Sequence, residues 1–163
     1  MTIAVLNSLD RPAFVEAVGW IFEHSPWVAE RAFDARPFAN VEALHAAMTE
    51  QVENSTFAEK LALLKAHPDL GARARLSPAS AQEQAGVGLD NLTPNEFQQL
   101  HRLNADYRRR FGFPFLLAVK GSTKHDILRA LQARIESSSE DEYREALRQV
   151  YRIARFRLED IIT

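Results

Sequence analysis

The sequence contains no cysteine, so disulfides and thiolate metal sites are excluded. It also lacks any run of about 18 apolar residues, which a membrane-spanning helix requires. Charge of one sign is not in excess: the formal net charge is −2, which gives no electrostatic reason to bind nucleic acid or an anionic membrane. Hydrophobic residues make up 46% and charged residues 26%, proportions typical of a globular protein.

Export and targeting signals are not found in the residues given. The first residues, MTIAVLNSLDRPAF, lack the basic start and long apolar stretch of a signal peptide. The last four, DIIT, differ from the carboxy-terminal tripeptide of peroxisomal proteins. We therefore expect a cytoplasmic protein without a nucleic-acid or membrane partner.

Repeats, low-complexity tracts and linkers are absent as well, which predicts one domain over residues 1–163. Six glycines and seven prolines separate helical patterns, and little of the alternation typical of strands is present. Helices are predicted over residues 11–24, 26–35, 41–53, 56–66, 78–84, 94–110, 122 or 123 to 136, and 139–161. The fold class predicted is all-α, a compact packing of seven or eight helices.

Two capping boxes mark helix starts most clearly. Thr93 and Glu96 form one, with proline at the first helical position between them. Ser139 and Glu142 form the other, which opens the last helix. The stretch 113–119 fits none of these helices. It could be a short buried strand, but no pairing partner is evident, and we expect an extended segment between two helices.

His67 is the first candidate for chemistry. The helix expected over 56–66 ends before it, because Pro68 disfavours helical geometry at the preceding residue. A helix carboxy-terminus favours the protonated imidazole, and a loop histidine held this way can act as an acid, a base or an anion ligand. The alternative is a histidine that only caps the helix or completes a hydrogen-bond network.

Ser80 and Glu83 are a second candidate pair. Three residues apart on a predicted helix, they share one face and present a hydroxyl and a carboxylate together. The alternative for Glu83 is a solvated carboxylate near a helix amino-terminus. Asn104 interrupts the apolar face of the helix over 94–110, where it either completes a buried network or contacts a ligand. The histidines show no HExxH spacing, so a metal site is not expected.

Arg157 is a third candidate, because it falls on the apolar stripe of the last helix. That stripe follows the spacing of one inward face and consists of Leu147, Val150, Ala154, Arg157 and Ile161. An arginine there must snorkel, pair with a buried carboxylate or bind a ligand anion. Arg148 falls on a different face and is expected to be solvated.

Several stretches, in order, resemble the OHCU decarboxylase family. They are residues 23–27 (EHSPW), 36–38 (RPF), 64–71 (LKAHPDLG), 80–84 (SAQEQ), 104–120 (NADYRRRFGFPFLLAVK) and 153–160 (IARFRLED). The resemblance covers nearly the whole chain. Members of the family act on 2-oxo-4-hydroxy-4-carboxy-5-ureidoimidazoline (OHCU), the last labile intermediate between urate and (S)-allantoin.

The resemblance implies a role for particular residues. It places the catalytic pair at His67 and Glu83, and substrate contacts at Pro68, Ser80, Gln84, Arg157 and the main chain of Phe115, Leu116 and Leu117. The spacing Gly86-Val87-Gly88-Leu89 departs from the family pattern, which leaves the details of that loop open. The resemblance also implies an all-α homodimer without a cofactor, and the substrate's own imine would accept the electrons that carbon dioxide leaves behind.

Two other functions stay open at this point. One is a cofactor-free lyase or hydrolase acting on another small ureide in the same pocket. The other is a helical protein-binding module, which predicts a broad exposed apolar patch and no need for His67.

Overall fold

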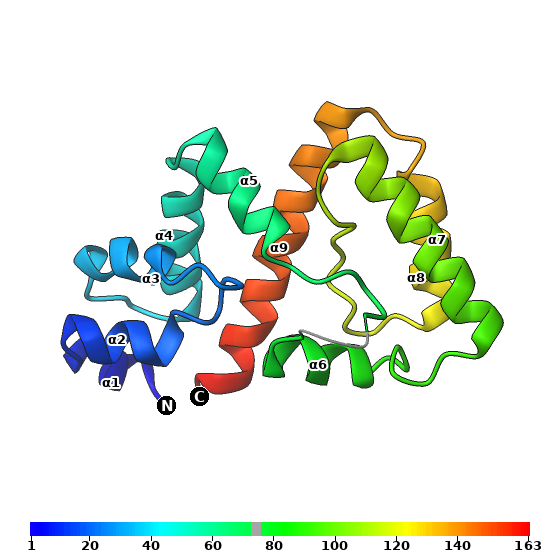
Figure 1. Ribbon diagram of the computed structural model, residues 1–163. Helices are drawn as coiled ribbons and strands as arrows, with labels where there is room; N and C mark the ends of the chain where they lie inside the picture. Colours follow the sequence, from blue (N-terminus) through cyan, green and yellow to red (C-terminus); the bar gives the residue numbers. More distant parts are fainter. Residues whose placement is uncertain (73–75) are drawn as a thin grey trace. The chain divides into compact units, whose positions relative to one another are not determined.

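The structure is a computed structural model that describes residues 1–72 and 76–163. Within these ranges the chain forms nine α-helices and one short 3-10 helix, and no strand (Figure 1). In chain order they are α1 (Ile3–Ser8), α2 (Arg11–Val18), α3 (Trp27–Ala32), η1 (Phe33–Ala35), α4 (Val41–Glu53), α5 (Phe57–Lys65), α6 (Pro78–Ala85), α7 (Pro94–Phe111), α8 (Lys124–Arg134) and α9 (Ser139–Ile161). The predicted all-α class is confirmed, and no helix in these ranges has both the length and the apolar character needed to cross a membrane.

The chain packs as two compact units. The first comprises Met1–Ala66 and Tyr151–Thr163, and the second comprises His67–Val150. In the first unit α3 packs against both α2 and α4, and in the second α7 packs against α8. Helix α9 contributes its last part to the first unit and its beginning to the second. One domain over residues 1–163 stays a prediction.

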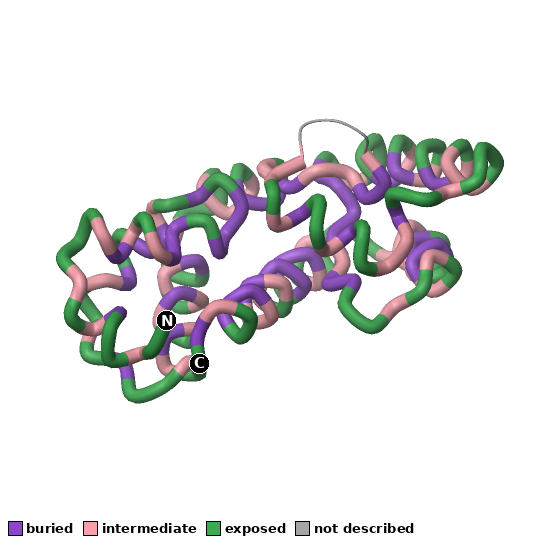
Figure 2. The backbone as a smooth tube through the Cα atoms, turned by 90° about the horizontal axis from the view of Figure 1, so that it is seen from below, coloured by how far each residue is buried: buried purple, intermediate pink, exposed green. Residues whose placement is uncertain are grey.

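Each unit has its own apolar core. Along the helices, buried and exposed residues alternate with the helical period, so that one side of each helix is covered (Figure 2). Fully buried large side chains of the first unit include Leu6, Phe14, Phe22, Leu44 and Met48, and those of the second include Leu100, Tyr107, Phe115 and Ile127. Burying each such side chain contributes about 1.5–3 kcal/mol to folding.

The predicted helix starts lie close to the observed ones. Thr93 and Glu96 form the expected capping box at α7, and Thr56 with Glu59 forms another at α5. The capping box predicted at Ser139 and Glu142 is wrong. Ser138 caps α9 instead, accepting the backbone N–H of Asp141 at 3.2 Å.

Helix ends agree less well with the sequence. The helix predicted over 11–24 ends at Val18, where Gly19 follows, and the chain then turns so that buried Glu23 meets Arg157. The helix predicted over 26–35 is α3 followed by η1, with Pro26 as the residue before the first turn. Helix α1 was not predicted, because six residues are too few to display a helical period.

Candidate active site

His67 lies directly after α5, in a loop. The helix ends at Lys65, Ala66 caps it, and Pro68 prevents His67 from continuing the helix. The side chain of His67 is buried, with 6% exposure, whereas Pro68 is half-buried. The predicted loop position of His67 is confirmed, and its catalytic role stays a prediction.

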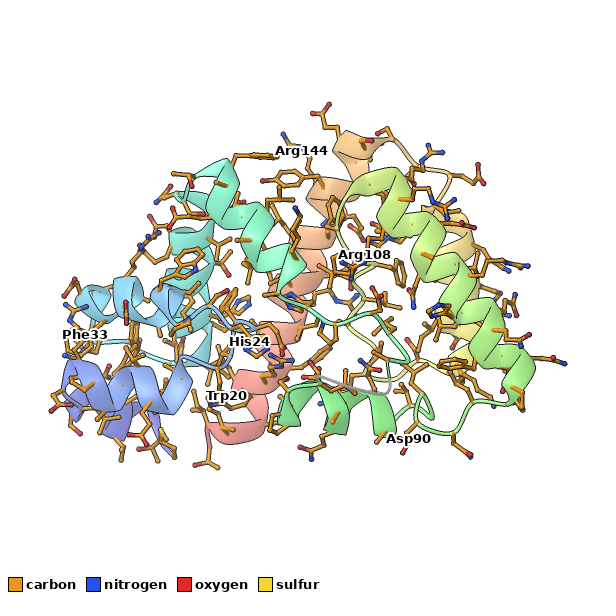
Figure 3. All side chains as sticks on the ribbon, viewed as in Figure 1. Trp20, His24, Phe33, Asp90, Arg108 and Arg144 are labelled. Atoms are coloured by element: carbon orange, nitrogen blue, oxygen red, sulfur yellow. The ribbon has the colours of Figure 1, made fainter. Side chains whose placement is uncertain are left out.

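The loop after Pro68 is bound to helices α6 and α7. Arg108 Nη2 on α7 lies 2.8 Å from Asp69 Oδ1, and in Figure 3 the labelled Arg108 side chain extends from α7. One turn earlier, Asn104 Nδ2 donates a hydrogen bond of 2.9 Å to the carbonyl of Leu70. The backbone N–H of Gly71 donates to Gln84 Oε1 at 2.8 Å, so α6 holds the loop as well.

Helix α6 presents three polar side chains on one face. Ser77 caps the helix by accepting the N–H of Ser80 at 3.1 Å, and Pro78 occupies the first turn. Ser80, Glu83 and Gln84 then follow at the i, i+3, i+4 spacing that places side chains side by side. Ser80 and Gln84 are buried and Glu83 is half-buried, so the face that carries them is turned away from bulk water.

Gln84 joins the helix to the loop in a defined orientation. A backbone N–H can only donate, so the Gln84 side-chain oxygen faces Gly71 and its Nε2 is left to donate elsewhere. Through this contact the structure brings the loop that follows His67 and the polar face of α6 to one place. A hydroxyl, a carboxylate and an amide donor stand on that face, which suits a small polar ligand.

Two cavities border the same loop. One, of about 610 Å³, is lined by Gln84, Asp90 and apolar residues of α6, α7 and the segments that precede them. The other, of about 300 Å³, is lined by residues 69–72, Asn104 and neighbouring side chains of α7. Both volumes fall near or within the range typical of small-molecule sites.

The segment predicted to be extended, from Phe113 to Val119, has no regular secondary structure and pairs with no strand in the described chain. Side chains replace a neighbouring strand: Arg134 Nη1 donates to the carbonyl of Leu116 at 2.6 Å, and the N–H of Ala118 donates to Gln149 Oε1 at 2.9 Å. Phe115 and Leu116 are buried and Leu117 is half-buried. These contacts satisfy buried backbone groups and fix the segment, while its contact with substrate stays a prediction.

Arg134 belongs to a buried network with Glu142 and Tyr107. Glu142 Oε1 accepts hydrogen bonds from Tyr107 Oη at 2.5 Å and from Arg134 Nε at 2.9 Å. Burial, followed by the hydrogen bond to Glu142, raises the pKa of the Tyr107 phenol well above its usual value. Glu142, predicted as a capping residue, therefore anchors the arginine that holds the extended segment.

Arg157 is on the inward face of α9, as predicted. With 4% exposure, it places Nη2 2.9 Å from Glu23 Oε2 and donates through Nη1 to the carbonyl of Ile21 at 3.2 Å. Pairing with a buried carboxylate was one of the alternatives that the sequence left open, and the structure shows this pairing. Arg157 and Glu23 belong to the first unit, whereas His67 and Glu83 belong to the second, so the convergence of Arg157 with them stays a prediction.

Sequence patterns did not identify Glu23, Arg134 or Gln149. Each contacts a residue far along the chain, with separations of 134, 18 and 31 residues, so no local spacing indicates the pair. In the described part of the chain, no three histidine, aspartate or glutamate side chains are grouped as ligands of a metal ion.

Comparison with known proteins gives consistent matches over both units. The family described as OHCU decarboxylase matches residues 7–159. A Haloferax volcanii protein named 2-oxo-4-hydroxy-4-carboxy-5-ureidoimidazoline decarboxylase is 46% identical over 158 residues, which are 97% of this chain and 94% of that protein. A Bacillus subtilis protein, uric acid degradation bifunctional protein PucL, is 48% identical over 162 residues, and this chain spans 33% of its length. A crystal structure of (S)-allantoin synthase is similar at a TM-score of 0.80 and 35% identity, covering 99% of this chain and 54% of that one.

Proposed function

The chain belongs to the OHCU decarboxylase family, and from this premise we propose that it converts OHCU to (S)-allantoin in the degradation of urate. It is a carboxy-lyase. The observation that supports our assignment of the reacting groups best is the hydrogen bond from Gly71 to Gln84. It ties the loop that begins at His67 to the face of α6 that carries Ser80 and Glu83.

The substrate supplies its own electron sink. Its carboxylate is on a carbon that also bears a hydroxyl and adjoins a carbon–nitrogen double bond. When the bond to carbon dioxide breaks, its electron pair forms a carbon–carbon double bond and the imine nitrogen takes up a proton. The resulting enol then loses its hydroxyl proton while the ureido-bearing carbon gains one, which gives allantoin. On this scheme the protein needs to orient the ring and move protons, and no cofactor is required.

Each polar group of the site has a place in this scheme. Glu83 and Ser80 hold the hydroxyl and the ring nitrogens. His67 contacts the hydroxyl or the departing carboxylate and transfers protons, while Gln84 contributes its Nε2 donor. Arg157 and the main chain of residues 115–117 hold the carbonyl or ureido end, and Pro68 shapes the pocket.

Burial strengthens these contacts. Hydrogen bonds and charges act more strongly where water is excluded, and a single positioned acid or base typically contributes about 10²–10⁴-fold to a rate. His67, Ser80 and Gln84 are all buried, which supports their use in binding and proton transfer.

The proposal includes two finer points, of which the family resemblance implies the first and the sequence composition suggests the second. The protein is a homodimer, and it works in the cytoplasm. Sedimentation equilibrium tests the first point, with a mass close to twice 18.5 kDa expected. Fractionation of the source cells tests the second.

The test of the function uses freshly prepared OHCU, which decays unaided in water. Added protein is expected to accelerate carbon dioxide release in proportion to its concentration, and heat-unfolded protein should not. If OHCU decays at the buffer rate while another small ureide is consumed, the alternative of a different lyase or hydrolase takes its place. If the protein consumes neither OHCU nor another ureide, the alternative of a helical protein-binding module replaces the proposed function.

A further inference from the structure

Three consecutive residues of the loop after Pro68 are each held by a separate side chain. Arg108 contacts the Asp69 carboxylate at 2.8 Å, Asn104 the Leu70 carbonyl at 2.9 Å, and Gln84 the Gly71 N–H at 2.8 Å. Two of the three side chains come from one face of α7, four residues apart. The loop is thus a fixed element, although it has no regular secondary structure.

Asn104 is the unusual member of this group. It lies between the buried residues Leu100 and Tyr107 on the apolar face of α7, and its own exposure is 4%. Its Nδ2 donates to Leu70, while its Oδ1 is buried with no hydrogen-bond partner among the described residues. A buried amide oxygen without a partner disfavours folding. An apolar residue would avoid that cost, so the reason for an asparagine here is what its nitrogen does for the loop.

Helix α7 also approaches the backbone of the loop very closely. Gly71 has φ +78°, and a Cβ built on it would lie 2.5 Å from Leu100 Cδ2. Only glycine accepts both this backbone conformation and this contact without a shift. Helix α7 therefore contacts the loop at both the Leu70 carbonyl and Gly71.

These contacts act close to His67 along the chain. Leu70 is three residues from His67, and the ring of Pro68 fixes one of the intervening backbone torsions. Fixing the Leu70 carbonyl therefore limits where the imidazole can be placed. Arg108 contributes less, because its pair with Asp69 is partly exposed and screened by water.

We propose that Asn104 is a positioning residue for the reaction: it holds the loop through the Leu70 carbonyl so that His67 stands correctly against the substrate. This proposal rests on the proposed function in one respect, because it takes His67 as the reacting group. In this role Asn104 acts on the reaction through the loop and His67. Its removal should lower the rate of the chemical step and leave substrate binding nearly unchanged.

The test uses two variants and a matched control. Asn104→Asp keeps the size of the side chain but replaces the donor with an oxygen that repels the Leu70 carbonyl. Asn104→Leu removes both polar atoms, including the buried oxygen without a partner. Asn95→Asp makes the same chemical change at an exposed position of the same helix.

In both Asn104 variants kcat should fall by about 10–100-fold, since a misplacement of the order of 1 Å has an effect of that size. KM should change little, and Asn104→Leu should melt no lower than the parent protein. In ¹H–¹⁵N spectra the amide signals of residues 67–71 and the ring signals of His67 should move. Asn95→Asp should leave kcat and these signals as they are.

Parental kcat in a folded Asn104→Asp or Asn104→Leu protein would overturn the proposal. Failure of both variants to fold would overturn it too, because Asn104 would then hold the fold rather than the catalyst. If the parent protein does not accelerate OHCU decay, the proposed function fails, and the spectra still decide the positioning role. Unmoved loop signals contradict it and shifted ones support it.

Discussion

His67 and Glu83 differ in their surroundings, and this difference sets what a substitution at each should do. His67 is buried at the start of a loop that three side chains hold, whereas Glu83 is half-buried on a short helix. Neither His67 nor Glu83 is among the buried apolar side chains that form the core of each unit. Changes that keep their size should therefore affect chemistry much more than folding.

We predict that His67→Asn and Glu83→Gln each lower the rate of OHCU decarboxylation by about 10²–10⁴-fold, the usual contribution of one acid–base group. Helical circular dichroism should be unchanged in both. The controls are His125→Asn and Glu136→Gln, which alter the same residue types at exposed positions. An His67→Asn protein with parental turnover would remove His67 from the mechanism.

Arg157 poses a different question, because its guanidinium already has a buried carboxylate partner. Lysine cannot contact Glu23 and the Ile21 carbonyl with the same geometry, since it lacks the planar fork of arginine. We predict that Arg157→Lys lowers stability by about 1.5–3 kcal/mol, the range for a hydrogen bond to a charged group, and also raises KM.

The matched control is Arg148→Lys. Arg148 is on the same helix but is 71% exposed, and it pairs with Glu145 at 3.0 Å. Arg148→Lys should change neither the free energy of unfolding, measured by chemical denaturation, nor KM, measured by steady-state kinetics. If Arg157→Lys loses stability without any rise in KM, Arg157 serves the fold and not the substrate.

At the scale of the helix, an ion pair between Glu96 and Lys124 stabilises the start of α7. The hydrogen bond from Lys124 Nζ, at 2.8 Å, and then the one from the Thr93 N–H lower the pKa of Glu96 from 4.5 to about 2. A carboxyl group with a lower pKa in the folded state stabilises the fold above its unfolded pKa. That stabilisation is lost as the pH falls from 4.5 toward 2.

We therefore predict that part of the acid sensitivity of the protein comes from this cap. Melting temperatures recorded across that pH interval should fall less steeply for Glu96→Gln than for the parent protein. Lys124→Gln should flatten the curve as well, and the double variant should add little, because both changes remove the same interaction. If melting temperature depended on pH equally in Glu96→Gln and in the parent protein, protonation of Glu96 would not contribute to the acid sensitivity.

The same scale shows what a sequence can predict. Helix starts were predictable at Asn40, Thr56, Thr93 and Thr123, since a cap joins residues three positions apart. Glu142 has the same local spacing, but Tyr107 and Arg134 bind it from elsewhere in the chain. Local spacing cannot reveal such competition.

The candidate site divides in the same way. The shared face of Ser80 and Glu83 follows from helical geometry alone. The bonds that place this face beside the His67 loop do not, because Gln84 and Asn104 reach residues 13 and 34 positions away. The loop itself could be predicted, since Pro68 ends the helical geometry at His67, whereas its anchoring required the fold.

At the scale of the whole molecule, the proposed groups are unevenly divided. The loop, α6 and the extended segment all belong to the unit His67–Val150, which therefore carries both proposed acid–base groups. The other unit contributes Arg157. An enzyme built this way has its proton-transfer groups in one compact unit, and the outcome of the reaction should depend on which face of the substrate that unit covers.

The stereochemistry of the product tests this arrangement. Unaided decay of OHCU passes through a planar carbon that water can protonate from either face, and the allantoin formed is racemic. A ring held by Ser80 and Glu83 exposes only one face to the acid of the protein. We predict that the protein yields dextrorotatory (S)-allantoin, and that in deuterium oxide the new carbon–hydrogen position carries deuterium, since its proton comes from an exchangeable group.

Circular dichroism of the product, followed from the moment of mixing, measures the outcome, with buffer alone and His67→Asn protein as controls. Racemic allantoin at the buffer rate would contradict both the catalysis and the proposed orientation. Racemic allantoin formed faster than in buffer would support catalysed decarboxylation. It would also show that water supplies the final proton after the enol has left the protein. OHCU also decays unaided, so the catalysed and spontaneous routes compete. The enantiomeric excess should therefore rise with protein concentration. An excess that does not change with protein concentration would contradict this competition.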